Sequence, residues 1–373
     1  MPRAPLIFLA LVPLLLSQCS TARFYTQAAS GQWEIQRKAR PIEKVLADPA
    51  TPAPLKSKLE LVQEIRAYAR NTLNLPAEKQ YHRYTDLQRK HLVWVVFAAP
   101  EFSLKPHTWR YPFLGDLSYR GWFKEKDATA LATQLRSRGL DVFVAEVDAY
   151  STLGVLSDPI LNTFIDLPPR DLAELLFHEL THQRLYLPND TDFNEALATA
   201  IARHATRRWL ADTHRTRELT AYNREDRILT DFIQELTHTR AALEKTYTQT
   251  PLSSDARRRA KTTAFTDLRH RADHLNRKHG GTLKIDKWFA QPVNNARLNS
   301  IATYYDLVPA IDHLLTHHCQ NNLETLLNLL KTTRPLTPTQ RLTWLQSQTA
   351  LTPRQAPTSQ SASTKPPPAP ATH

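Results

Sequence analysis

Apolar residues recur every three or four positions along much of the chain, a spacing that predicts amphipathic helices. In residues 55–75, for example, Leu59, Val62 and Ile65 fall on one helical face. Further helices are predicted over residues 20–45, 129–138, 166–187, 191–211 and 294–331. The 373 residues include only seven glycines, which also favours a helix-rich chain.

Two short stretches are instead rich in β-branched and aromatic residues, a composition typical of strands. Residues 91–98 read HLVWVVFA, and residues 139–149 read GLDVFVAEVDA, with the glycine at the turn. Because helices predominate around them, we expect an α+β fold that is helix-dominated, with a small mixed sheet.

The stretch from 215 to 279 contains no glycine, and its apolar positions keep a helical spacing on both sides of Pro251. This pattern predicts a long helical hairpin over about 213–280, inserted within the main domain. Gly280 and Gly281 are expected to end it.

The two ends differ from the main domain, expected over residues 19–333. Residues 1–18 carry Arg3 and a short apolar run, as in a signal peptide. Cys19 follows, as in a bacterial lipobox, although Gln18 departs from the small residue usual there, and simple secretion is the alternative. A lipid on Cys19 would place the protein at the periplasmic side of the cell envelope; Ser20 favours the outer membrane. Residues 334–373 are Pro/Ser/Thr-rich and are expected to be disordered.

Composition narrows the function classes. Hydrophobic residues make up 41% and charged residues 23%, as in globular proteins. Two cysteines exclude a disulfide-rich scaffold and a zinc site built from cysteines. The net charge of +12 favours anionic surroundings, but the basic residues are spread along helical stretches, so no nucleic-acid partner is expected.

The candidate chemistry lies in His178-Glu179-Leu180-Thr181-His182. On a helix, a spacing of four places His178 and His182 one above the other, where two imidazoles can bind one zinc ion. Asp166 is expected to cap this helix, and Glu179 is placed to reach a water on the metal. A surface helix with a histidine pair is the alternative.

A third ligand is expected from the next helix. Glu195 follows His182 by 13 positions, and Pro188, Asn189 and Asp190 allow the chain to turn back between them. Two histidines, one glutamate and an open fourth position are typical of a catalytic site with one Zn²⁺ per chain. The alternative role for Glu195 is to cap a helix that begins near Thr191.

The stretch HELTHQRLYLPNDTDFNEALATAIARH at 178–204 resembles the zinc site of the predicted-aminopeptidase lipoprotein family of bacteria. Four more stretches fit that family in order: FYTQAASGQ at 24–32, YRGWF at 119–123, GLDVFV and AYSTLGVLSDP within 139–159, and NNARLNSIATYYDLVPA at 294–310. The resemblance covers 19 to about 330 and implies a zincin-like, gluzincin-type metallopeptidase core.

Within that resemblance, Thr199 stands where better-known gluzincins have an aspartate, so Thr199 and Asn194 are expected to support the ligands from behind. The strand at 142–149 is expected to lie at a sheet edge and to hold a peptide substrate, with Tyr150, Ser151, Thr152 and Gly154; an interior strand with a glycine turn is the alternative. Tyr304 or Tyr305 is expected to stabilise the oxyanion, and core packing is their alternative.

These observations predict zinc-dependent hydrolysis of peptide bonds with Glu179 as general base, and the resemblance implies an aminopeptidase. The sequence alone does not choose between an aminopeptidase and an endopeptidase, because no carboxylate can be assigned to bind a free amine. Nor does it specify an oligomeric state. The alternatives are a lipid-anchored helical adaptor with a structural or vestigial metal site, and a polyanion binder.

Overall fold

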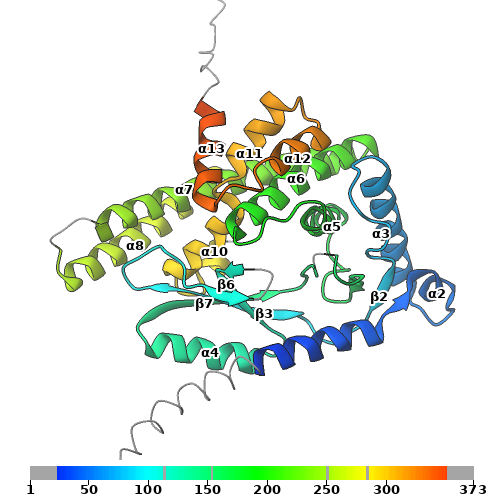
Figure 1. The fold of residues 1–373 in the computed structure, drawn as a ribbon, viewed down its shortest axis with the longest axis horizontal. Helices are drawn as coiled ribbons and strands as arrows, with labels where there is room; N and C mark the ends of the chain where they lie inside the picture. Colours follow the sequence, from blue (N-terminus) through cyan, green and yellow to red (C-terminus); the bar gives the residue numbers. More distant parts are fainter. Residues whose placement is uncertain (1–22, 112–114, 153, 249–251, 283–284, 351–373) are drawn as a thin grey trace, which may run out of the picture.

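The computed structural model describes residues 23–350 except 112–114, 153, 249–251 and 283–284. Helices dominate this part of the chain, and three small sheets lie among them. The predicted helix-dominated α+β class is therefore confirmed. In Figure 1 the central sheet lies above a lower layer, which is formed by α4 (Glu125–Ser137) and the helix of residues 23–38. Above the sheet lie the helices α5 (Pro169–Arg184), α6 (Thr191–Asp212) and α10 (Asn295–Tyr305).

The central sheet is antiparallel, with strand order β6 (Tyr119–Trp122), β3 (Val93–Pro100) and β7 (Leu140–Val147). β3 is rich in valine and aromatic residues, which suit a pleated and largely buried surface. In the described part of the chain β7 pairs with β3 alone, so β7 is an edge strand. Side chains alternate between the two faces of this sheet, and only one of those faces is covered by α4 (Glu125–Ser137).

The other two sheets are smaller. A mixed sheet contains β1 (Arg40–Pro41), β2 (Arg83–Thr85) and β8 (Ile160–Leu161), with β1 antiparallel and β8 parallel to β2. It lies beside α2 (Ile42–Ala47) and α3 (Ala53–Asn71). The third sheet pairs β4 (Trp109–Tyr111) with β5 (Gly115–Leu117).

Two packed helices, α5 (Pro169–Arg184) and α6 (Thr191–Asp212), form the centre of the largest apolar cluster. Phe177 of α5 and Trp209 of α6 are fully buried there. Sequence reasoning placed the cap of α5 at Asp166, and this was wrong, because the helix begins at Pro169 with Pro168 at the N-cap. Proline suits the first helical position because its φ is already helical and it needs no hydrogen bond there.

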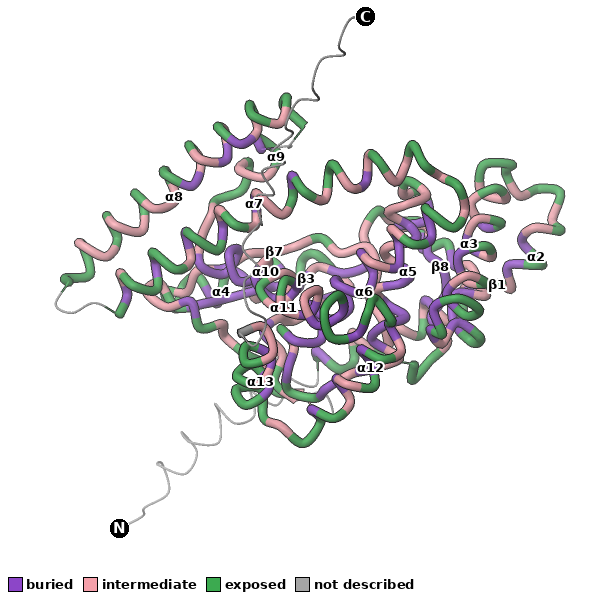
Figure 2. Tube along the Cα trace, turned by 90° about the horizontal axis from the view of Figure 1, so that it is seen from above, coloured by how far each residue is buried: buried purple, intermediate pink, exposed green. Residues whose placement is uncertain are grey.

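The region expected as a long hairpin holds α7 (Thr216–Thr248) and α8 (Ser254–Lys278), which pack side by side. Figure 2 shows the pair projecting from the body with much of its surface exposed. The hairpin packs in a second apolar cluster, in which Phe232, Leu236 and Leu268 join Leu104 and Leu298 from outside the hairpin. The short helix α9 (Ile285–Phe289) packs on α8.

The chain then forms α10 (Asn295–Tyr305), α11 (Val308–His313), the π-helical turn η1 (Leu314–His318) and α12 (Leu323–Lys331). A last helix, α13 (Pro338–Ala350), contradicts the prediction of disorder from residue 334 onward. Leu345 of α13 is fully buried and joins the main apolar cluster, so this segment does have a core-forming side chain. Residues 351–373 lie outside the described part of the chain.

The predicted signal peptide at 1–18 and the predicted lipid attachment at Cys19 also lie outside the described residues. Among the helices that are described, none combines the length and the apolar character needed to cross a bilayer.

Candidate metal centre

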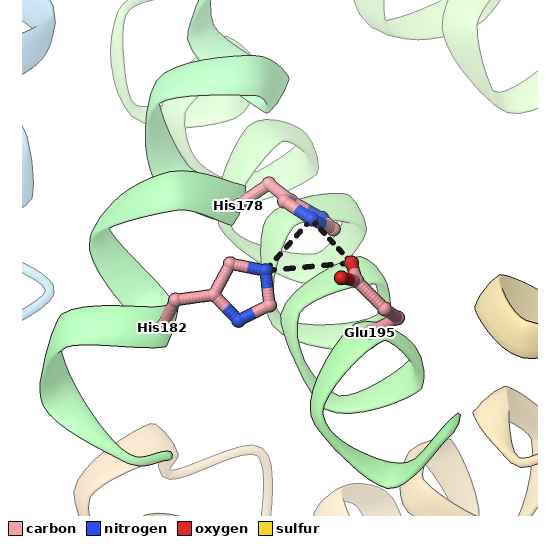
Figure 3. Close-up of side chains that lie close together, drawn as sticks. All are labelled: His178, His182 and Glu195. Atoms are coloured by element: carbon pink, nitrogen blue, oxygen red, sulfur yellow. Dashed lines mark hydrogen bonds and ion pairs between the residues drawn. The ribbon is translucent and has the colours of Figure 1, made fainter. Parts of the chain in front are cut away.

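Two packed helices bring together three side chains of the types that bind metal ions. His178 and His182 lie one turn apart on α5, and Glu195 extends toward them from α6, as Figure 3 shows. Nε2 of His178 lies 3.2 Å from Oε2 of Glu195 and 3.2 Å from Nε2 of His182. The third side of the triangle, from Nε2 of His182 to Oε2 of Glu195, measures 3.4 Å. In the described residues this is the one group of three such side chains close enough to share an ion.

These distances fit a tetrahedral zinc site. Ligand atoms at about 2.0–2.1 Å from one zinc ion, at the tetrahedral angle, lie about 3.3 Å from one another. The observed 3.2 to 3.4 Å agree with this spacing. Three protein ligands also leave the fourth tetrahedral position free, which is the arrangement of catalytic zinc sites.

The capping alternative for Glu195 does not match the structure. Asp190 is the N-cap of α6, and its carboxylate accepts the backbone N–H of Phe193. Glu195 lies further along the helix, with its carboxylate at the histidines. Alanines on α6, including Ala196 and Ala200, are fully buried and allow the close approach of α5.

The cluster is buried, so its charges interact strongly. Burial raises the pKa of Glu195, but attraction to His182 and hydrogen bonds from both histidines outweigh this and hold the pKa well below its ordinary value. For His182, burial lowers the pKa, and the neighbouring carboxylates of Glu195 and Glu179 together raise it by more. A buried carboxylate of this kind requires a positive partner, and a metal cation between the three side chains would supply one.

Glu179 lies next to His178 on α5, and its side chain lines the same cavity as the metal ligands. Burial raises the pKa of Glu179, while the two histidines oppose that increase. A carboxylate with a raised pKa is a stronger base, as a group that takes a proton from water requires.

The structure separates the two candidate tyrosines. Tyr304 lines the cavity, and its ring lies 6.1 Å from that of His178, nearly parallel to it. Tyr305 is not among the residues that line the cavity, and the charges that act on its pKa are those of Glu174, Arg203 and Asp226, so the structure does not place it at the oxyanion. Adjacent helical residues point about 100° apart, which accounts for the different surroundings of the two tyrosines.

Sequence reasoning missed two tyrosines at the site. The hydroxyl of Tyr119, on β6, donates to Oε1 of Glu195 at 3.4 Å. Tyr186 follows α5 and also lines the cavity. Burial and the Glu195 carboxylate raise the pKa of both phenols, so each keeps its proton and can donate it. Tyr119 lies within YRGWF, one of the motifs of the resemblance, and Tyr186 follows His182 by four residues, just beyond the end of α5.

Asn194 and Thr199 are the two residues that we expected to support the ligands. The side-chain amide of Asn194 both donates to and accepts from the backbone of Leu187, at 2.8 Å each, and so fixes the loop between α5 and α6. Thr199 is buried on α6, but no hydrogen bond within the described residues joins it to either histidine. Nδ1 of His182 is buried with no hydrogen-bond partner in the described part of the chain.

Of the four expected substrate residues, three line the cavity: Tyr150, Ser151 and Thr152. The hydroxyl of Tyr150 donates to the side chain of Gln32. The backbone N–H and the hydroxyl of Thr152 both donate to Asp158, which fixes this segment. Gly154 lies one step beyond, exposed and at φ 79°, and is not among the lining residues.

The cavity has a volume of about 650 Å³ and lies between the metal cluster and the face of the central sheet that α4 does not cover. We call this the open face of the sheet. The helix of residues 23–38 forms another wall and packs closely, because a side chain at Gly31 would collide with the ring of Phe123. Among the described lining residues the only carboxylates are Glu179 and Glu195, and there is no lysine or arginine.

The C-terminal helix supports the metal centre from behind. Arg341 of α13 is buried and forms an ion pair with Asp190, the N-cap of the helix that carries Glu195. Its guanidinium also donates to the backbone carbonyl of Leu336 at 2.8 Å. On α10, the hydroxyl of Thr303 donates to Asp192 in the first turn of α6, at 2.8 Å. The start of α6 is thereby held from two sides.

Comparison with known proteins identifies one family. The model of one protein family, described as "Putative aminopeptidase", matches residues 23–345. Searches of the curated proteins and of the solved structures gave no match. The family match includes the metal cluster, all three strands of the central sheet and most of α13. Since it spans most of the chain, the protein belongs to this aminopeptidase family.

Proposed function

We propose that the protein is a zinc-dependent peptidase that hydrolyses peptide bonds at the His178–His182–Glu195 centre. The observation that carries the proposal is the triangle of ligand atoms with sides of 3.2, 3.2 and 3.4 Å beside an open cavity. Two imidazoles and one carboxylate form a donor set that zinc favours. The family description supports a peptidase, and supports cleavage at the amino-terminal end of the substrate.

The chemistry divides between the ion and the chain. A zinc ion held by these three residues would polarise the scissile carbonyl and lower the pKa of a bound water to about 7. Glu179 accepts a proton from the attacking water at its carboxylate and later gives it to the leaving amine. Its place beside His178 and its raised pKa suit both transfers.

One phenol is placed to stabilise the negative charge that develops on the carbonyl oxygen. Tyr304 of α10 lines the cavity beside the metal ligands, whereas Tyr119 of β6 donates its single hydroxyl proton to Glu195. Burial and nearby carboxylates raise the pKa of Tyr304 well above the ordinary value. Tyr304 therefore remains protonated and acts as a hydrogen-bond donor.

The test is hydrolysis of short peptides by the zinc-loaded full chain and by its Glu179→Gln variant. Glutamine has nearly the same shape but cannot accept the proton, so we expect zinc content and circular dichroism to stay unchanged. Turnover should fall by at least about 10²–10⁴-fold, the usual contribution of a general base. Comparing free and acetylated amino termini shows whether the enzyme is an aminopeptidase.

Equal turnover by the wild-type protein and Glu179→Gln would contradict this mechanism. No hydrolysis by a wild-type protein that holds its zinc would favour a lipid-anchored adaptor with a structural metal site.

We also propose that Cys19 carries a lipid that anchors the protein at the outer membrane, facing the periplasm. In support, Tyr25 and Trp33 on the helix of residues 23–38 are 41% and 69% exposed, as aromatic residues at a membrane surface are. Growth with a labelled fatty acid should label the wild-type protein and leave Cys19→Ser unlabelled. Equal labelling of the two would contradict the anchor.

A further inference from the structure

The open face of the central sheet carries a row of small side chains. On β3, Val95 pairs with Gly121 of β6 on one side and with Ala145 of β7 on the other. All three line the cavity. Cross-strand neighbours on one face lie about 5 Å apart, so the three form a continuous shallow trough across the sheet. We call Gly121, Val95 and Ala145 the small-residue trough.

The next facing positions of the sheet border the trough on both sides. Two residues along β3 on the metal side, Phe97 pairs with Tyr119, and their ring centroids are 5.7 Å apart. Two residues along β3 in the opposite direction, Val93 pairs with Val147 of β7. The trough is therefore a depression with an aromatic wall toward the metal centre and an aliphatic wall on the far side.

Gly121 is the residue that leaves this space open. A Cβ atom added there would have one heavy atom within 4 Å, Cγ2 of Val95 at 4.0 Å, so there is room for a side chain. Its backbone is not in the left-handed region, and the strand conformation does not require glycine. A glycine inside a strand weakens it, and such a glycine often marks a close approach by a ligand.

The trough and the metal cluster line the same cavity. Tyr119 occupies the same face of β6 two residues, about 7 Å, before Gly121, and its hydroxyl donates to Glu195. A peptide bound with its carbonyl at the metal cluster would therefore extend a nearby side chain along this face of the sheet toward the trough.

The chemistry of the walls selects for an apolar group. The described lining residues include no lysine or arginine, and the two carboxylates among them belong to the metal centre and the general base. This contrasts with a chain that has 48 basic and 36 acidic residues. A charged substrate side chain would lose its hydration in the trough without gaining a partner.

We propose that the small-residue trough binds an apolar side chain next to the scissile bond, and that the absence of a side chain at Gly121 allows large groups such as leucine or phenylalanine to enter. This inference rests on the proposed peptidase function, whose substrate class it specifies.

The test measures binding and turnover separately. Binding is measured with the zinc-loaded Glu179→Gln full chain, which is expected not to consume the peptide. The probes are two series of short peptides, one varied at the residue before the scissile bond and one at the residue after it. The varied residue is Ala, Leu, Phe, Asp or Lys. Gly121→Val fills the trough from β6, and Ala145→Val fills it from β7 if the first variant folds poorly. Ala130→Val, exposed on α4, is the matched control outside the cavity.

In one of the two peptide series, the one varied on the side of the scissile bond that faces the trough, we expect the Leu and Phe peptides to bind more tightly than the Asp and Lys peptides. The difference should be at least about 10-fold, as in other apolar pockets. Gly121→Val should weaken binding of the Phe peptide by at least about 10-fold. The Ala peptide should stay within about twofold, and Ala130→Val should change nothing. In the enzyme with Glu179 intact, kcat/KM should follow the same order.

Equal binding of apolar and charged peptides, or equal weakening of all peptides by Gly121→Val, would overturn the inference. Selective binding without any hydrolysis by the wild-type protein would support the trough and overturn the peptidase function. Hydrolysis without side-chain selectivity would support the peptidase function and overturn the trough.

Discussion

The two faces of strand β3 show how one short sheet serves two purposes. On one face, Val96 and Ala98 are buried against α4 in a closed apolar cluster with Trp122 and Leu135. On the other face, Val93, Val95 and Phe97 border a cavity of about 650 Å³ that contains the metal ligands. The residues of the two sets alternate along the same strand. The two faces therefore differ because one packs against α4 and the other borders the cavity.

This contrast separates stability from recognition. On the covered face every buried side chain has atoms around it, and its removal leaves a void. On the open face, Val93, Val95 and Phe97 belong to the main apolar cluster and also line the cavity, so smaller residues there enlarge a binding site as well as changing a core. Substitutions on the covered face should therefore change mainly the free energy of unfolding. Substitutions on the open face should change mainly peptide turnover and zinc affinity.

The largest expected effect on stability comes from the covered face. Trp122, which is 7% exposed on β6, packs in the closed cluster next to Gly121 in the chain. Trp122→Ala should lower the free energy of unfolding by about 3–5 kcal/mol, the usual cost of removing a large buried aromatic group. Urea unfolding of the metal-free proteins measures this. Zinc affinity of the folded variant should stay within about twofold, and a change in zinc affinity with unchanged stability would contradict the division between the faces.

A smaller effect of the opposite kind is expected from the open face. Tyr119→Phe removes only the hydroxyl that donates to Oε1 of Glu195 at 3.4 Å. Its free energy of unfolding should change by less than about 1.5 kcal/mol, as for one neutral hydrogen bond. Peptide turnover or zinc affinity should fall about 10-fold, because partners of metal ligands tune the ion that those ligands hold. A variant that loses stability and keeps both zinc affinity and turnover would show that Tyr119 is only a core residue.

The helical pattern made much of the fold and of the metal centre predictable. The spacing of His178 and His182 gives their relation on a helix directly, because both positions lie on one element. Glu195 was also found, since the turn residues before it predict a helix that returns. The strand at 139–149 was placed by its composition, and the structure has β7 there at the sheet edge.

Contacts between distant elements were not predictable in the same way. Tyr119 reaches Glu195 across 76 positions of sequence, and no spacing rule connects a strand to a helix over that distance. Arg341 pairs with Asp190 across 151 positions. Its helix was read as disordered because prolines and threonines around it hid the one fully buried leucine, Leu345. Tyr304 and Tyr305 were indistinguishable until the direction of α10 was known.

The most direct test of the account is a zinc titration of the chelator-stripped full chain, wild type and Glu195→Gln, with circular dichroism to show that the helices persist. The wild-type protein should bind one zinc ion per chain. Glu195→Gln should bind it at least about 10-fold more weakly, because the amide no longer neutralises the dication. A Glu195→Gln protein with zinc affinity within about twofold of wild type would contradict the assignment of the metal centre.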